Sequence, residues 1–235
     1  MNNIVTRIFR SSLGKKYIMA LTGFGLFGFV VAHLIGNLQI FLGPESINRY
    51  GAFLQGLGEL LWMARISLLV MVLLHIWAAI KISAENKAAR PIAYQSYNPT
   101  TASYASRTML MSGLIIFFFI IYHLLHFTAQ IPGVNLSHQD FKILHDEKGR
   151  HDVYAMMILG FRQPIVSIFY IIAISLLSLH LSHGVRAMFQ SLGWKKKSYA
   201  NALHCFATGV SIFIFVGYIS IPIAILLGFG KEILK

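Results

Sequence analysis

Five long apolar stretches constrain the fold of this chain more than any other feature. They cover about residues 17–42, 60–82, 108–129, 163–186 and 200–227. A helix needs roughly 20 apolar residues to cross the hydrocarbon core of a bilayer, and each stretch is long enough. The chain is 56% apolar and 12% charged, so its charges are too few to cover a soluble domain of this size. We therefore expect an all-α fold, an integral membrane bundle of five transmembrane helices.

The placement of the basic residues predicts the orientation of these helices. With the N-terminus inside, the inner segments contain twelve Lys and Arg residues and one acid, Glu85, whereas the outer segments contain eight cations and seven acids. An excess of cations on the cytoplasmic side is typical of membrane proteins. We expect a cytoplasmic N-terminus and a C-terminus outside. The formal net charge of +12 is then explained by topology, which argues against nucleic-acid binding.

The rest of the chain predicts a single transmembrane domain over residues 1–235. Residues 1–16 carry four cations and no cleavage-type segment, as expected for a retained cytoplasmic tail rather than a signal peptide. The outer loop 131–162 is too polar to span, and its end, 153–161, is apolar enough to lie along the membrane surface. The inner loop 83–107 is long for a connection, and either docks a cytoplasmic partner or is an ordinary surface loop.

Histidines inside the predicted spans are the strongest functional signal. Ionisable side chains in a bilayer are costly and by default mark function. One such histidine is more often a neutral imidazole bonded to a neighbouring carbonyl, but here four helices each carry at least one. The only cysteine, Cys205, excludes an iron–sulfur cluster on this chain's own thiolates and a C-x-x-C-H haem attachment. The span histidines are His33, His75, His123, His126, His180 and His183.

The depths of these histidines predict two layers. His33 and His123 lie in the outer thirds of helices that run outward, and His75 and His180 lie in the inner halves of helices that run inward. At a rise of 1.5 Å per residue, the layers are on the order of 12–15 Å apart. Two neutral imidazoles facing each other across an iron hold a b-type haem in a helix bundle. Two layers of two therefore predict two b haems.

Two of these histidines have a companion three residues later, His126 after His123 and His183 after His180. Residues three apart share a helix face, so spacing leaves open which member binds iron. The other member could orient the ligand, bond a haem propionate or reach a core carbonyl.

Small and aromatic residues near the histidines admit two interpretations. The glycines of the first span, Gly23, Gly25 and Gly28, clear space either for a flat macrocycle or for close helix packing. The phenylalanine run at 117–119 is expected to face lipid rather than to line a cofactor site.

Four stretches carry a resemblance to a known family, AHLIGN (32–37), LLHIWAAIK (73–81), YHLLHF (122–127) and FYIIAISLLSLHLSHGVRAMFQSLGW (169–194). Over nearly its whole length the chain resembles the five-helix, single-chain di-haem cytochrome b subunit that anchors succinate dehydrogenases and fumarate reductases. The resemblance implies that His33 and His123 bind the iron of the outer haem, and His75 and His180 that of the inner haem. These are the pairs that the depths predict.

The resemblance also implies partners. A flavoprotein with covalent FAD and the dicarboxylate site, and an iron–sulfur protein, would sit on the cytoplasmic face of the cell's inner membrane. This chain would relay electrons between the iron–sulfur protein and a membrane quinone, menaquinone by the resemblance. Some fumarate reductases of the family move protons with a glutamate two residues before the fourth ligand. Here that residue is Ser178, so that proton path is not carried over.

Quinone chemistry requires a proton donor or acceptor near the quinone oxygens. Glu59 begins the second span beside an apolar run and is either a partly buried acid that serves the quinone or an interfacial acid without a role. The candidates near the outer haem are Asn37, Gln39, Glu59 and Arg65. Near the inner face, basic side chains would either pair with haem propionates or act as topology anchors. These are Lys81, Arg107 and Arg186.

Three alternatives are weighed against this function. A cytochrome b subunit of a hydrogenase or formate dehydrogenase would also use intramembrane histidines. A proton-coupled transporter with a histidine relay would show paired acids in its spans and repeated halves, whereas here only Glu59 lies at a margin. A structural anchor without haem leaves four histidines at matched depths unexplained. The outer-loop histidines, His138, His145 and His151, match no tight metal template, so no metal site is expected there.

Overall fold

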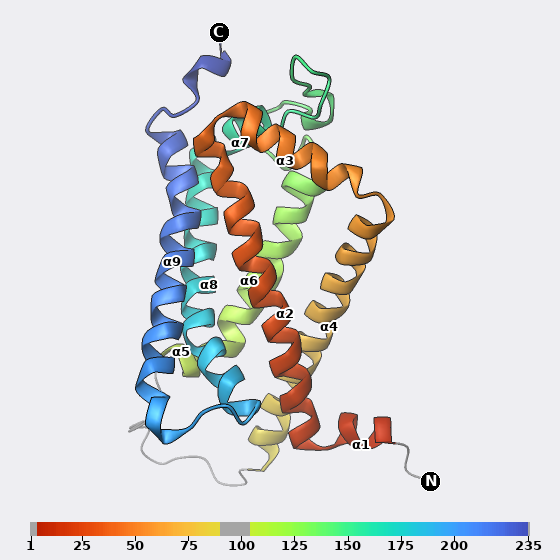
Figure 1. Cartoon of the computed structure of the whole chain (residues 1–235), viewed down its shortest axis with the longest axis vertical. Coiled ribbons are helices and arrows are strands. Elements are labelled where there is room, and N and C mark those ends of the chain that lie inside the picture. Colours follow the sequence, from red (N-terminus) through yellow and green to blue (C-terminus); the bar gives the residue numbers. More distant parts are fainter. Residues whose placement is uncertain (1–3, 90–103, 235) are drawn as a thin grey trace. The chain divides into compact units, whose positions relative to one another are not determined.

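The computed structural model of the chain describes residues 4–89 and 104–234, and its regular structure over these residues is helical (Figure 1). Five helical segments are long and apolar enough to cross a membrane. They are Ser12–Leu42, Glu59–Ala88, Met109–Thr128, Pro164–Ser191 and Lys197–Leu226. The expected all-α fold with five transmembrane helices is confirmed. The orientation of the termini stays a prediction.

The elements follow one another along the chain as nine α-helices and five shorter helical turns in the described residues. The α-helices are α1 Ile4–Arg10, α2 Ser12–Leu38, α3 Pro44–Gly56, α4 Glu59–Ala88, α5 Tyr104–Arg107, α6 Met109–His123, α7 Val153–Phe161, α8 Pro164–Ser191 and α9 Ala200–Leu226. A π-helical turn, Leu124–Thr128, continues α6, and 3-10 turns cover Gln39–Leu42, Phe141–Ile143, Lys197–Tyr199 and Lys231–Leu234.

Several helices extend beyond the apolar stretches that predict them. Helix α2 begins at Ser12 rather than near residue 17, α4 continues to Ala88, and α8 ends at Ser191. Hydropathy marks only the part of a helix that lies in hydrocarbon, whereas the backbone hydrogen bonds continue into the polar zone. Residues 83–88 and 104–107 of the expected inner loop are therefore helical, and residues 90–103, to which the docking hypothesis applies, lie outside the described residues.

The chain falls into two compact units, and each of the five long helices contributes to both. Unit 1 comprises Met1–Phe29, Ala64–Gly113 and Leu179–Ser211. Unit 2 comprises Val30–Met63, Leu114–Ser178 and Ile212–Lys235.

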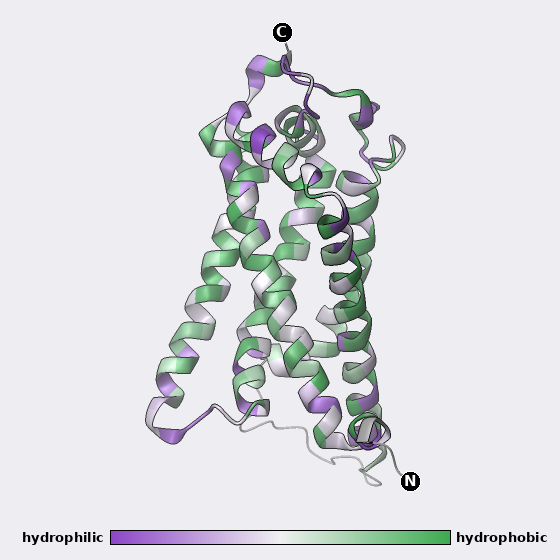
Figure 2. Ribbon diagram, turned by 45° about the vertical axis from the view of Figure 1, so that its right-hand side comes forward, coloured by the Kyte–Doolittle hydropathy of each residue, from purple (hydrophilic) through white to green (hydrophobic). Residues whose placement is uncertain are grey.

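Large apolar side chains are exposed along the long helices, as expected where lipid is the outer solvent. Leu21 of unit 1 is 60% exposed and Ile165 of unit 2 is 73% exposed. In Figure 2 the hydrophobic colour runs along the long helical segments. This exposure is greatest on helix α4, in which Ala78 is the one buried residue.

The core of unit 1 is small and is accompanied by a buried ion pair. Ala20, Val185, Met188 and Ala207 form its buried apolar cluster. Lys15, only 4% exposed, pairs with Glu85 and donates a second hydrogen bond to the carbonyl of Arg10 at 3.1 Å. A buried ammonium requires such partners, because an unpaired buried charge is strongly destabilising. The pair joins the start of α2 to the end of α4.

Helix α7 lies in the core of unit 2, where seven of its nine residues are buried. The expectation that residues 153–161 lie along the membrane surface stays a prediction, but protein rather than lipid covers most of this helix. The segment is apolar on all sides, and a helix of this kind is typically buried in the interior of a protein. Tyr154, Met157 and Ile158 pack there with Ile221 and Ile225 of α9.

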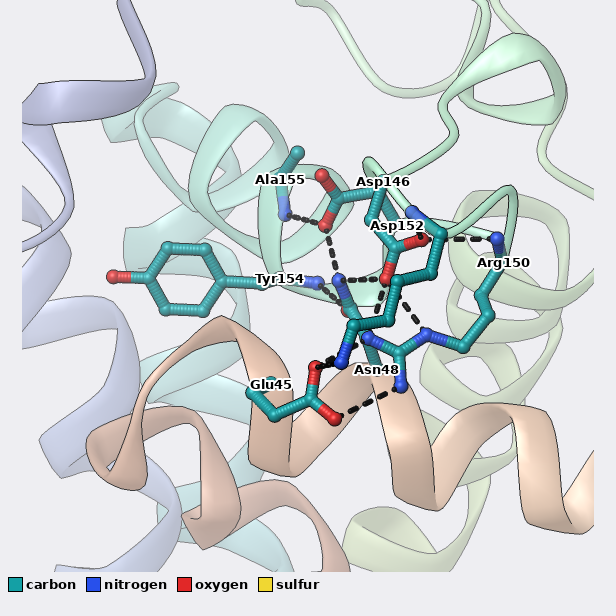
Figure 3. A network of polar contacts seen from close by, with 8 residues as sticks. Glu45, Asn48, Asp146, Arg150, Asp152, Tyr154 and Ala155 are labelled. Atoms are coloured by element: carbon teal, nitrogen blue, oxygen red, sulfur yellow. Dashed lines mark hydrogen bonds and ion pairs between the residues drawn. The ribbon is translucent and has the colours of Figure 1, made fainter.

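A polar network fixes the loop before α7 to helix α3 within unit 2 (Figure 3). Arg150 donates to Glu45 at 2.6 Å and to Asp146 at 2.8 Å, and Lys148 donates to Glu45 at 3.0 Å. The hydrogen bond from Arg150 is the main cause that lowers the pKa of Glu45 to about 2. Glu45 is therefore ionised throughout the physiological pH range.

Asn48, 1% exposed, is the buried member of this network. Its amide donates to Asp152 at 3.0 Å and its oxygen accepts the backbone N–H of Tyr154 at 2.9 Å. We expect Asn48→Ala to lower the free energy of unfolding by about 2–4 kcal/mol, because it leaves buried polar groups unpaired. Urea unfolding in detergent measures this loss. Arg49→Ala, at an exposed position of the same helix, is the control, and an equal loss in both variants would contradict the assignment.

Candidate functional site

In unit 2, two span histidines face each other. His33 comes from α2 and His123 from the last residue of α6. Their ring centroids are 5.8 Å apart and the rings are nearly perpendicular, at 88°. Both rings are partly exposed in the chain alone.

In unit 1, a second pair has the same arrangement. His75 comes from α4 and His180 from α8, and their ring centroids are 6.5 Å apart at an angle of 60°. The structure thus brings together the two pairs that the sequence predicts, one pair within each unit. That these four residues bind iron stays a prediction.

The spacing within each pair fits a shared iron. Two metal–imidazole bonds of about 2 Å each, with half of each ring added, separate two ring centres by roughly 6 Å. The observed 5.8 Å and 6.5 Å lie on either side of this value. The residues present therefore suit two haem groups, each held between two imidazoles.

Hydrogen bonds fix the proton of His75 on Nδ1. Nδ1 lies 3.1 Å from the carbonyl oxygen of Met19, which can only accept, and 3.2 Å from the hydroxyl of Thr22. The Thr22 hydroxyl donates its own proton to the carbonyl of Ile18 at 2.7 Å, so its oxygen also accepts from Nδ1. Nε2 of His75 is then unprotonated and able to bind a metal.

His180 is held in the same way. Its Nδ1 lies 3.1 Å from the hydroxyl of Ser112, which donates its proton to the carbonyl of Met109 at 3.1 Å. When the serine proton bonds that carbonyl, the serine oxygen accepts the Nδ1 proton, which leaves Nε2 of His180 unprotonated.

In unit 2, tyrosine hydroxyls take the place of serine and threonine. Nδ1 of His33 lies 3.0 Å from the hydroxyl of Tyr218, which donates to the carbonyl of Val30 at 2.9 Å. Nδ1 of His123 lies 3.3 Å from the hydroxyl of Tyr170, which also lies 3.0 Å from Nδ1 of His126. Each paired histidine thus has a hydroxyl at Nδ1.

The two companion histidines differ in burial. His126 is fully buried, at 0% exposure, and its ring stacks on Phe127 with centroids 3.9 Å apart. Its Nε2 has no hydrogen-bond partner among the described residues. His183 is only partly buried, in unit 1.

Of the quinone candidates, Asn37 contacts a paired histidine. Its amide donates to Nε2 of His33 at 3.1 Å and to the carbonyl of His33 at 2.7 Å. Gln39 accepts from the hydroxyl of Ser46 at 3.1 Å. Glu59 is exposed rather than partly buried, because it stands at the polar first residue of α4.

The remaining candidate cations lie in unit 1 and are exposed. They are Arg65, Lys81, Arg107 and Arg186. Arg186 lines a surface cavity of about 200 Å³ together with Lys195 and His204. Since Arg65 belongs to unit 1 and the other three quinone candidates to unit 2, the structure does not gather the four within one unit.

The hydroxyl residues at Nδ1 are functional candidates that sequence reasoning missed. The available signal was a hydroxyl inside an apolar span, as at Thr22, Ser112, Tyr170 and Tyr218. A polar group at membrane depth needs a partner, and these four find a histidine. Spacing alone could not pair residues on different helices.

Close packing around the histidines also departs in part from expectation. Phe118 is 61% exposed, but Phe119 is buried, with ring centroids 6.0 Å from His123 and 5.0 Å from Tyr170. The expectation that the whole run at 117–119 faces lipid is therefore wrong for Phe119. Of the glycines in α2, Gly23 approaches His75, since a Cβ there would lie 3.2 Å from its Cε1.

Comparison with known proteins gives one family. The family model described as succinate dehydrogenase/fumarate reductase transmembrane subunit matches residues 85–219, more than half of the chain. The matched stretch contains His123 and His180, one member of each facing pair. No curated protein and no solved structure gives a significant match.

Proposed function

The chain belongs to the family of succinate dehydrogenase/fumarate reductase transmembrane subunits, and we propose that it relays electrons between an iron–sulfur subunit and a membrane quinone through two b haems. The observation that carries this proposal is the pair of facing histidines in each unit, with Nδ1 hydrogen-bonded and Nε2 able to bind a metal. Family membership favours this function over a hydrogenase or formate dehydrogenase cytochrome and over a proton-coupled transporter.

His33 and His123 hold one haem iron in this proposal, and His75 and His180 hold the other. A b haem, when bound, supplies a one-electron carrier whose potential depends on its ligands and their hydrogen bonds. The chain's own contribution is to orient each imidazole through the hydroxyl at Nδ1, because that bond selects the tautomer able to bind metal. The surrounding apolar helices exclude water from both sites.

The partners and the orientation follow from the family and from the charge pattern. The N-terminus lies in the cytoplasm and the chain spans the cell's inner membrane. A flavoprotein with FAD and an iron–sulfur protein bind on the cytoplasmic face, and the dicarboxylate chemistry takes place in the flavoprotein. Residues of unit 1 near that face, including Lys81, Arg107 and Arg186, pair with haem propionates or with these partners.

Quinone, menaquinone by the resemblance, binds beside His33 in unit 2. The Asn37 amide now donates to Nε2 of His33, and it is released for another acceptor when that nitrogen binds a metal. A quinone carbonyl is an acceptor of the required kind. Gln39 and the exposed Glu59 are further candidates of the same unit for bonding quinone or exchanging its protons with water, and Arg65 of unit 1 remains a candidate.

The haem content of the purified chain tests this function. In mild detergent, a pyridine haemochrome assay and a reduced-minus-oxidised spectrum should give about two haem b per chain, reducible by a menaquinol analogue. His204→Ala, which removes an exposed histidine, should keep both haems. A chain without haem, from cells with ample iron and haem, would refute the proposal.

A further inference from the structure

The Tyr170 hydroxyl, which is bonded to His123, differs in its second hydrogen-bond partner from the three hydroxyls that are bonded to the other paired histidines. Thr22, Ser112 and Tyr218 each donate their proton to a backbone carbonyl. Such a hydroxyl has no proton left for the histidine, so its oxygen must accept the Nδ1 proton. The Tyr170 hydroxyl has no carbonyl partner among the described residues. Its two partners are Nδ1 of His123, at 3.3 Å, and Nδ1 of His126, at 3.0 Å.

We propose that His126 is a positioning residue that takes the place of the missing carbonyl. Its Nδ1 accepts the Tyr170 proton, so that the Tyr170 oxygen accepts the Nδ1 proton of His123. The inference rests on the proposed function, in which His123 binds a haem iron through Nε2. It assigns a role to the second histidine of the YHLLHF stretch, which spacing leaves open.

When the Tyr170 proton is itself hydrogen-bonded to one of the two histidines, two arrangements of this chain of hydrogen bonds remain. In the first, His123 donates to Tyr170 and Tyr170 donates to His126, which leaves Nε2 of His123 unprotonated. In the second, both bonds run the other way, and His123 carries its proton on Nε2, where it blocks metal binding. Only the first arrangement is compatible with a ligand role.

A histidine differs from a carbonyl because it can also donate. The backbone therefore fixes the tautomer of His75 through the Met19 carbonyl, whereas the tautomer of His123 depends on the direction of the bonds to His126. Nε2 of His126, which has no partner among the described residues, carries the proton in the first arrangement and is bare in the second. Metal binding at His123 selects the first arrangement.

The packing of His126 supports a fixed position for its Nδ1. The residue is fully buried and stacks on Phe127. Gly160 of α7 lies against it, since a Cβ at Gly160 would come within 3.0 Å of Nε2. The π-helical turn Leu124–Thr128 begins directly after His123 and contains His126. Such turns interrupt the regular spacing of side chains and occur often at functional sites.

Three variants test the role of His126. His126→Leu removes the acceptor and frees the Tyr170 proton for His123, which weakens the ligand. We expect the midpoint potential of the unit 2 haem to rise while the unit 1 haem keeps its potential. His126→Asn keeps an acceptor oxygen near the place of Nδ1 and should keep the wild-type potential. Tyr170→Phe removes the bridging hydroxyl and should raise the same potential.

Redox titration of the reduced-minus-oxidised spectrum resolves the two haems, and low-spin electron paramagnetic resonance signals identify them. The signal lost in His33→Ala marks the unit 2 haem, and the haem of unit 1 reports that each variant is folded. Ser112→Ala, which removes the hydroxyl at His180, should shift only the unit 1 haem.

Two results would overturn the inference while the proposed function stands. The first is that both haem potentials remain unchanged in His126→Leu. The second is that His126→Leu and His126→Asn shift the midpoint potential of the unit 2 haem equally, as expected if His126 serves only for packing. A wild-type chain without haem would instead remove the proposed function and this inference together.

Discussion

Replacing both members of one histidine pair should remove one bis-histidine haem, whereas replacing one member of each pair should remove both. A haem iron loses its bis-histidine ligation when either ligand is missing, so the second replacement within a pair adds no further loss. His33→Ala with His123→Ala should therefore leave one low-spin haem. His33→Ala with His180→Ala should leave none.

Low-spin signals and haem content of the purified double variants measure this difference. A third double variant, His33→Ala with His75→Ala, is a matched test of the pairing itself, because both residues come from the first two long helices. It should also leave no bis-histidine haem. One centre surviving in that variant would mean that His33 and His75 share an iron, contrary to the facing pairs in the structure.

The pairs are predictable from the sequence because depth in a membrane is a one-dimensional quantity. A helix rises by a constant 1.5 Å per residue, so a span and a residue number give a depth. The choice between His123 and His126 was not predictable in this way. The two histidines do share a face, since both Nδ1 atoms reach the Tyr170 hydroxyl. What distinguishes them is that His123 faces His33 on another helix, and residue spacing contains no signal for that contact.

Burial was the least predictable property of the site. Phe119 is expected from the sequence to face lipid and helix α7 to lie along the membrane surface, and protein covers both of them in unit 2. Lipid and protein interior are equally apolar, so hydrophobicity cannot tell which of them covers a side chain. The four hydroxyls at Nδ1 were not predicted either, because each of them bonds a histidine on another helix, and hydrophobicity does not show which helices are neighbours.

Enlarging Gly113 should remove the haem bound by His75 and His180 and spare the other. A Cβ at Gly113 of α6 would lie 3.5 Å from Cε1 of His180, an ordinary contact. Cε1 is bonded to Nε2, the atom that binds metal in the proposed function. Gly113→Ala should therefore be tolerated. The longer branches of Gly113→Leu should displace the His180 ring, because a Cβ there already contacts Cε1 and Nδ1, and haem content should fall from about two per chain to about one.

The haem that Gly113→Leu should retain shows whether the effect of the added side chain is local. Gly113 and His180 belong to unit 1, whereas His33 and His123 belong to unit 2, so a local steric effect leaves the unit 2 haem with its wild-type spectrum. Leu110→Phe, also on α6 at a side chain 54% exposed, is the control for added bulk and should keep both haems. Loss of both haems in Gly113→Leu would indicate misfolding, and retention of both would place the cofactor away from Nε2 of His180. A graded result, with alanine tolerated and leucine not, is expected if the position of the His180 ring determines haem binding in unit 1.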